Sequence, residues 1–241
     1  MPPSEKALSA SEPKKLTAFN VDVGSWGALL ALLLSLTSIG IQVVAYLRGP
    51  VISFLAPQKI EFTCSTQTDT KCDDDANLTI FAPGMAYVNA APDPYSGVIM
   101  KEAVAVTFVG AGRSPVKKLW LNWEYFTERT DAGESKTVAA PFAVPARASV
   151  SHETQFYARY VVNEAGNVSR ENFLKFNDFK KMIDANGGIE RIRLDFSVTE
   201  FRGSAGINTR SASCEVIVDD LMRSHAADPD VGTFPRDCNA N

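Results

Sequence analysis

Residues 192–218, IRLDFSVTEFRGSAGINTRSASCEVIV, decide the fold, because two alternating runs flank a short turn sequence. The run of small and polar residues at 202–206 predicts the turn, and a second strand is expected at about 207–218. The first run places four apolar side chains on one face of a strand: Ile192, Leu194, Phe196 and Val198. The stretch therefore predicts an antiparallel β-hairpin.

The same two-residue period continues on the N-terminal side of this hairpin. Residues 59–64 alternate between polar and apolar, and residues 102–109 and 116–126 flank a turn at 110–115. Shorter strand candidates lie at 51–55, 78–81 and 85–88. In the run 116–126, the expected core face holds Leu119, Leu121, Trp123 and Tyr125. About eight to ten short strands with turns between them favour a sheet protein.

One helix is expected among the strands. Asn177 can cap the run 178–185, and the sequence Asn186-Gly187-Gly188 can end it. The chain is therefore predicted to be mainly β. We expect an antiparallel β-sandwich of immunoglobulin-like architecture with one short packed helix at 49–225, and a polar C-terminal tail at 226–241.

A run without charged residues precedes the strands. Residues 26–47, WGALLALLLSLTSIGIQVVAYL, would form a helix about 33 Å long, which is enough to cross a hydrocarbon layer of about 30 Å. We therefore expect a single transmembrane helix at 23–48, with the lipid bilayer as its surroundings. The alternatives are a cleaved secretory signal, for which the run is long, and a buried soluble helix, which is rarely apolar on every face.

The cysteines indicate which side of the membrane each part occupies. Lysines and arginines near the two ends of the run are balanced, so they do not orient it. All four cysteines follow the run, namely Cys64, Cys72, Cys214 and Cys238. Two disulfides in an oxidising compartment would explain this placement, with local pairing favoured, whereas unrelated reduced thiols are the alternative. We expect residues 1–22 to be a flexible cytoplasmic tail and the β domain to be periplasmic or extracellular.

Composition and motifs argue against several function classes. The 241 residues carry 24 Lys and Arg against 28 Asp and Glu, a net charge of −4, which argues against nucleic-acid binding. Two histidines without a nucleophile motif argue against an enzyme, so we expect no catalytic residue and no cofactor. Asp73, Asp75 and Asn77 have calcium-ligand spacing, but the EF-hand pattern fails, and a solvated acidic loop is the alternative to a metal site.

Small and polar side chains recur along the apolar run. Spacings of three and four place them on one face of a helix, where close backbone approach favours helix pairing in lipid: Gly27, Ala31, Ser35, Ser38 and Gln42. The expected function is that of a membrane-anchored accessory or interaction subunit whose helix binds other membrane proteins and whose exported domain binds or braces a partner. The first alternative is an independent surface module that binds a ligand, and the second is an exported enzyme.

Overall fold

The computed structural model describes residues 23–65, 67–68, 71–112, 114–130, 133–159, 161–162, 168–169, 172–184, 188–203 and 206–240. The predicted tail at 1–22 lies outside these residues. The chain divides into two compact units, residues 1–46 and residues 47–241.

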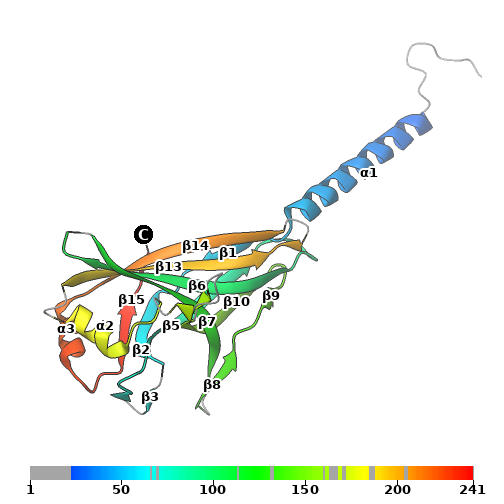
Figure 1. The fold of residues 1–241 in the computed structure, drawn as a ribbon. Helices are drawn as coiled ribbons and strands as arrows, with labels where there is room; N and C mark the ends of the chain where they lie inside the picture. Colours follow the sequence, from blue (N-terminus) through cyan, green and yellow to red (C-terminus); the bar gives the residue numbers. More distant parts are fainter. Residues whose placement is uncertain are drawn as a thin grey trace, which may run out of the picture. The chain divides into compact units, whose positions relative to one another are not determined.

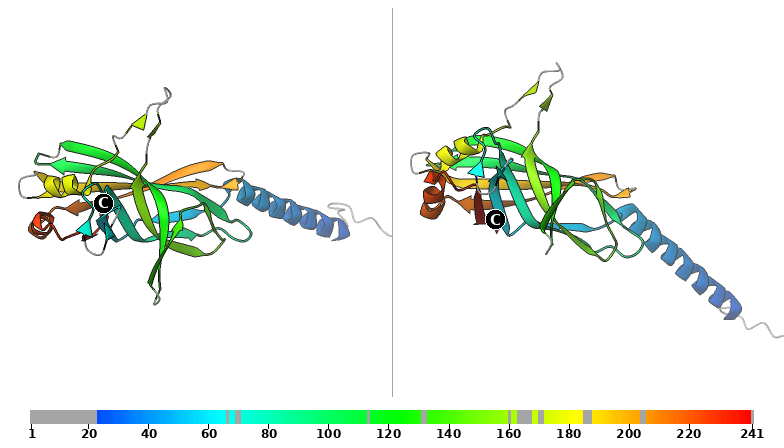
Figure 2. Two further views of the ribbon diagram at one scale, coloured as in Figure 1. Left: turned by 60° about the horizontal axis from the view of Figure 1, so that its bottom comes forward. Right: turned by 90° about the horizontal axis from the view of Figure 1, so that it is seen from below.

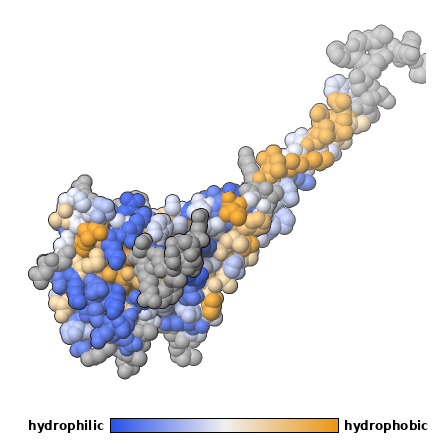
Figure 3. All heavy atoms as spheres, in the orientation of Figure 1, coloured by the Kyte–Doolittle hydropathy of each residue, from blue (hydrophilic) through white to orange (hydrophobic). Residues whose placement is uncertain are grey.

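The first unit holds one long helix, α1 (Val23–Arg48) (Figure 1). Its stretch Trp26–Val44 is long and apolar enough to cross a membrane, and no part of that stretch is buried. Apolar side chains cover its visible surface (Figure 3). The helix prediction is confirmed, and its crossing of a membrane stays a prediction.

The second unit is built on one antiparallel sheet that curls into a half-barrel (Figures 1 and 2). Its strands follow the order β15-β2-β5-β10-β7-β6-β13-β14-β16, while β1, β8 and β9 pair with β5, β7 and β6. The bounds are β1 (Ile52–Leu55), β2 (Lys59–Cys64), β5 (Leu78–Asn89), β6 (Gly97–Gly110), β7 (Pro115–Thr130), β8 (Gly133–Val138), β9 (Phe142–Val144), β10 (Ser149–Ala158), β13 (Ile189–Phe201), β14 (Ile207–Ile217), β15 (Thr233–Asp237) and β16 (Asn239–Ala240). Two short ladders complete the unit, β3 (Gln67–Thr68) with β4 (Lys71–Cys72) and β11 (Val161–Val162) with β12 (Val168–Ser169).

The predicted hairpin is confirmed, because β13 pairs with β14 from Arg191 opposite Ile217 to Phe201 opposite Ile207. The predicted two-sheet, immunoglobulin-like sandwich is not what the structure shows. β5, β6, β7 and β13 are 12 to 16 residues long, and register shifts interrupt several of their pairings. Long strands with bulges twist and bend strongly, so one sheet can curl over its own apolar face without a second sheet.

A bulge also changes the core face predicted for β7. Gln155 lies opposite Tyr125, but Phe156 lies opposite Trp123, so Glu124 is an extra residue. Beyond this bulge Phe126, rather than Tyr125, packs against the buried Trp123, at 5.5 Å between ring centroids. Tyr125 instead contacts Tyr157. Leu119, Leu121 and Trp123 are buried as predicted.

Two helices, rather than the single one predicted, accompany the sheet, α2 (Phe176–Ile183) and α3 (Asp220–Ala227). Asn177 lies inside α2 and does not cap it; the cap position is Lys175, whose side chain makes no capping hydrogen bond. In α3, the Asp219 carboxylate accepts a hydrogen bond from the Met222 amide at 2.8 Å. A cluster of phenylalanines packs α2 against the concave face of the sheet: Phe62, Phe108, Phe176, Phe179 and Phe234.

Buried and half-buried cations join the two helices. The Lys180 ammonium of α2 donates to the backbone carbonyls of Asp228 and Val231, just after α3. In return, the Arg223 guanidinium of α3 donates to the carbonyls of Asp184 and Ile189, at 2.9 and 2.8 Å. The segment 226–241, expected as a polar tail, therefore begins in α3 and supplies β15, which pairs with β2.

Candidate functional site

The small-residue stripe of α1 is exposed along its whole length. At about 100° per residue, Gly27, Ala31, Ser35, Ser38 and Gln42 fall within an arc of about 80°, and all five are exposed. A Cβ atom added at Gly27 would meet nothing within 4 Å. The stripe is therefore a small-residue surface that no described residue of this chain covers.

The structure brings the four cysteines together in local pairs. Cys64 pairs with Cys72, at 5.9 Å between Cα atoms, and Cys214 pairs with Cys238, at 5.4 Å. The first pair ties the strand β2 to the acidic loop, and the second ties β14 to the end of the chain. Disulfides are typical of proteins in oxidising compartments.

The acidic loop uses its carboxylates for ion pairs and hydrogen bonds. The Asp75 carboxylate accepts a hydrogen bond from the Lys175 ammonium at 2.5 Å, and this contact lowers the pKa of Asp75. Asn77 forms a β-bridge with Lys175, and the Asp73 carbonyl accepts from the Ala76 amide. Among the described residues, no three His, Cys, Asp or Glu side chains come together in a group that could hold a metal ion. A calcium site at Asp73, Asp75 and Asn77 stays a prediction.

A polar pair crosses the interior of the half-barrel. Tyr87 of β5 and Glu102 of β6 are separated by two strands in the sheet order, yet the Tyr87 hydroxyl donates to Glu102 Oε1 at 2.5 Å. The curl of the sheet brings them together, and both side chains are fully buried. Burial raises the pKa of Glu102 to about 7, although the hydrogen bond from Tyr87 acts in the opposite direction. Burial, followed by the nearby Glu102 carboxyl, raises the pKa of Tyr87.

Aromatic side chains line the same end of the interior. The His152 imidazole stacks on Phe126, at 4.7 Å between centroids, and meets Phe142 edge-on at 4.3 Å. Phe142 in turn contacts Tyr87 at 5.4 Å. Desolvation lowers the pKa of His152, which favours the neutral imidazole. These aromatic rings pack around the buried Tyr87–Glu102 pair and form part of the core.

A second buried carboxylate joins the β13–β14 hairpin to the start of the sheet domain. Glu200 Oε1 accepts from Asn208 Nδ2 at 2.8 Å and from Arg210 Nε at 3.1 Å. Arg202 Nε lies 3.6 Å from the same oxygen and donates to the Pro50 carbonyl at 3.0 Å. A fully buried carboxylate is stable in such surroundings because cations and donors replace its lost hydration.

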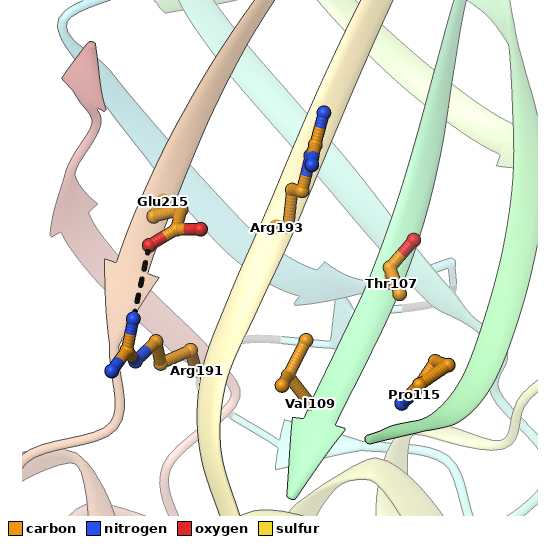
Figure 4. Close-up of a pocket in the computed structure, with 6 residues that line it drawn as sticks. All are labelled: Thr107, Val109, Pro115, Arg191, Arg193 and Glu215. Atoms are coloured by element: carbon orange, nitrogen blue, oxygen red, sulfur yellow. Dashed lines mark ion pairs between the residues drawn. The ribbon is translucent and has the colours of Figure 1, made fainter. Parts of the chain in front are cut away.

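The convex face of the sheet carries a shallow hollow of about 410 Å³ (Figure 4). In that view, Arg191 reaches toward Glu215, at 3.7 Å between Nη1 and Oε2, and Arg193 points away from this pair. Arg193 instead binds Asp195, at 2.9 Å. Thr107, Val109 and Pro115 complete the lining. Both arginines already have acidic partners, so the hollow has no excess of positive charge.

Sequence reasoning did not single out the buried acids. Glu102 begins the predicted strand 102–109 and Glu200 follows the alternation of β13, so each occupies an inward position of its strand. A charged residue in phase with apolar neighbours is the signal that could have found both. Their partners could not have been found this way, because Tyr87 and Glu102 meet only through the curl of the sheet.

No known protein-family model matches the chain, and no curated protein shows significant similarity to it.

Proposed function

We propose that this chain is a single-pass membrane protein that acts as an accessory or interaction subunit, with α1 in the bilayer and the half-barrel domain outside the cytoplasm. The observation that carries the proposal is the stretch Trp26–Val44, a long apolar helix surface with none of its residues buried. In water such a surface would be strongly unfavourable, whereas lipid accommodates it. The two disulfide-linked pairs in the β domain support an oxidising compartment for residues 49–241.

The small-residue stripe of α1 supports a helix partner. Without a hydrophobic driving force in lipid, helices associate through close backbone packing and hydrogen bonds between side chains. Glycine, alanine and serine along one face permit such an approach, and the Gln42 amide on the same face can hydrogen-bond across an interface. The occupant would be a transmembrane helix of another subunit or of a second copy.

The test compares matched substitutions on two sides of α1. Gly27→Leu with Ala31→Leu fills the stripe, while Gly40→Leu adds the same side chain at a position about 140° from the stripe's nearest edge. Gly40 also has nothing within 4 Å of an added Cβ atom. After mild detergent extraction, native mass measurement should show a complex for the natural chain and for Gly40→Leu, and its loss for the stripe variant. A monomer in all three cases, or an unchanged complex in all three, would contradict the proposal.

The alternative is an independent surface module that binds a soluble ligand. The hollow between Arg191, Arg193 and Glu215 favours it, because it offers donors and acceptors on an open sheet face. A monomeric full chain that retains a soluble ligand, and loses it in Arg193→Ala, would favour this second function.

A further inference from the structure

We infer that the end of the half-barrel at which the chain enters the domain docks into the lipid interface through an apolar rim formed by Val51, Phe201 and Ile207; this inference rests on the proposed membrane span. These three side chains are exposed in the structure, at 45 %, 43 % and 71 %. Together they form what we call the Pro50 rim. Its occupant is the boundary between the headgroups and the acyl chains of the bilayer that holds α1.

The rim is assembled from distant parts of the sequence around one residue. Val51 follows Pro50 directly, while Phe201 and Ile207 face each other across the end of the β13–β14 hairpin. The hairpin is held at this place because Arg202, next to Phe201, donates to the Pro50 carbonyl at 3.0 Å. The buried Glu200 lies on the other side of this arginine, so the contact is braced from within the fold.

The start of β6 packs against the same point. A Cβ atom on Gly97 would lie 2.5 Å from the end of the Ile52 side chain and 3.0 Å from Pro50 Cγ. Pro50 is itself buried. The chain is thus tightly packed into the domain from Pro50, the second residue after α1, onward.

Chain length then sets the depth of the rim. Pro50 is two residues after Arg48, where α1 ends, and two extended residues reach at most about 7 Å. The headgroup region on each side of a bilayer is about 5 to 8 Å thick. With α1 in the hydrocarbon layer, the Pro50 carbonyl and the hairpin bound to it would therefore lie at headgroup level.

The side chains of the rim fit that environment. Aromatic and branched apolar groups gain by leaving water at the boundary between headgroups and acyl chains. Exposed apolar side chains at this position would be unfavourable in water, but they help to hold the domain against a bilayer.

The experiment measures lipid contact at two matched sites of β14. Ile207→Trp places a fluorophore in the rim, and Ile217→Trp places the same fluorophore at an equally outward position, 61 % exposed, about 33 Å farther along the strand. Both are made in the full chain with Trp26→Phe and Trp120→Phe, so that the buried Trp123 is the only other tryptophan, and the same chain without the added tryptophan serves as the blank. The proteins are reconstituted in phosphatidylcholine–phosphatidylglycerol vesicles that contain a lipid with a shallow nitroxide.

Nitroxide quenching of the Ile207→Trp variant should exceed that of Ile217→Trp at least about two-fold, and iodide in the water should quench it less. Equal nitroxide quenching of the two variants, or equal access to iodide, would overturn the inference. Quenching of Trp26 in the Trp120→Phe chain, compared with the same chain carrying Trp26→Phe, tests the span by itself. If Trp26 is quenched and the rim is not, the membrane span stands and the docking of the rim fails; if Trp26 is not quenched, the span itself fails.

Discussion

The buried Glu102 should make the folded state less stable as the pH rises toward neutrality. In the unfolded chain its pKa returns to about 4.5, whereas burial raises it to about 7 in the fold. The folded state therefore binds the Glu102 proton more tightly than the unfolded state does. This difference is worth about 3 kcal/mol in the free energy of unfolding.

The sign and the pH window follow from these two values. Below about pH 4.5 both states are protonated at this site, and the protonated carboxyl adds no penalty. Between about pH 4.5 and 7 the unfolded state loses its proton first, so the free energy of unfolding falls as the pH rises. Above about pH 7 both states are ionised, and the full penalty of about 3 kcal/mol remains.

Glu102→Gln should remove this dependence while it preserves the shape of the side chain. The glutamine oxygen can still accept the hydrogen bond from Tyr87, and the variant resembles the protonated acid at every pH. We expect the variant and the natural chain to be similarly stable at pH 4.5, and the variant to be more stable by about 3 kcal/mol at pH 8.

Urea unfolding of the full chain in detergent, followed by the fluorescence of the buried Trp123, measures this difference. Glu190→Gln on the exposed side of β13 is the control, because it removes the same charge from a solvated position. The reasoning would be refuted if Glu102→Gln left the change in unfolding free energy between pH 4.5 and 8 equal to that of the natural chain.

Three further variants test the packing of the half-barrel, each by the shift in its urea midpoint. Asn89→Ala should lower the free energy of unfolding by about 3 kcal/mol, because the buried amide binds three backbone groups at 2.9 to 3.0 Å. A decrease smaller than about 0.5 kcal/mol would contradict this expectation. Gly97→Ala should lower the free energy of unfolding by about 1 to 3 kcal/mol, because the added Cβ atom would lie 2.5 Å from the end of the Ile52 side chain. An unchanged free energy of unfolding would show that the site can relax. Cys214→Ser with Cys238→Ser removes the disulfide between residues 24 positions apart and should lower the free energy of unfolding by about 3.5 kcal/mol. Unchanged stability would mean that the pair does not restrain the unfolded chain.

Local patterns were sufficient to predict the secondary structure of the most regular segments. The uncharged run predicted α1, and strict alternation predicted β13 and its hairpin partner β14. These signals lie within a few residues of one another, so no distant contact can easily override them. By contrast, α3 has only eight residues, and its sequence DLMRSHAA carries a weak apolar face; Arg223 and Met222 stabilise it through contacts with the rest of the domain.

The candidate sites also differ in whether the local sequence is sufficient to predict them. The stripe of α1 could be read from spacing because helix geometry alone determines which residues share a face. The bulge at Glu124 could not be read, because it depends on the register with β10, and it reverses which face Tyr125 and Phe126 occupy. The ion pair between Asp75 and Lys175 could not be predicted either, because the two residues are 100 positions apart in the sequence.

The sequence by itself determined that the chain has an apolar helix, an antiparallel β domain and cysteines confined to that domain, because periodicity and composition are local properties. Only the tertiary structure decided that a single sheet curls into a half-barrel, that Tyr87 meets Glu102 inside it, and that the β13–β14 hairpin binds Pro50 at the domain's start. The physical reason is that bulges and twist accumulate along long strands, and their sum, rather than any local pattern, sets which distant residues meet.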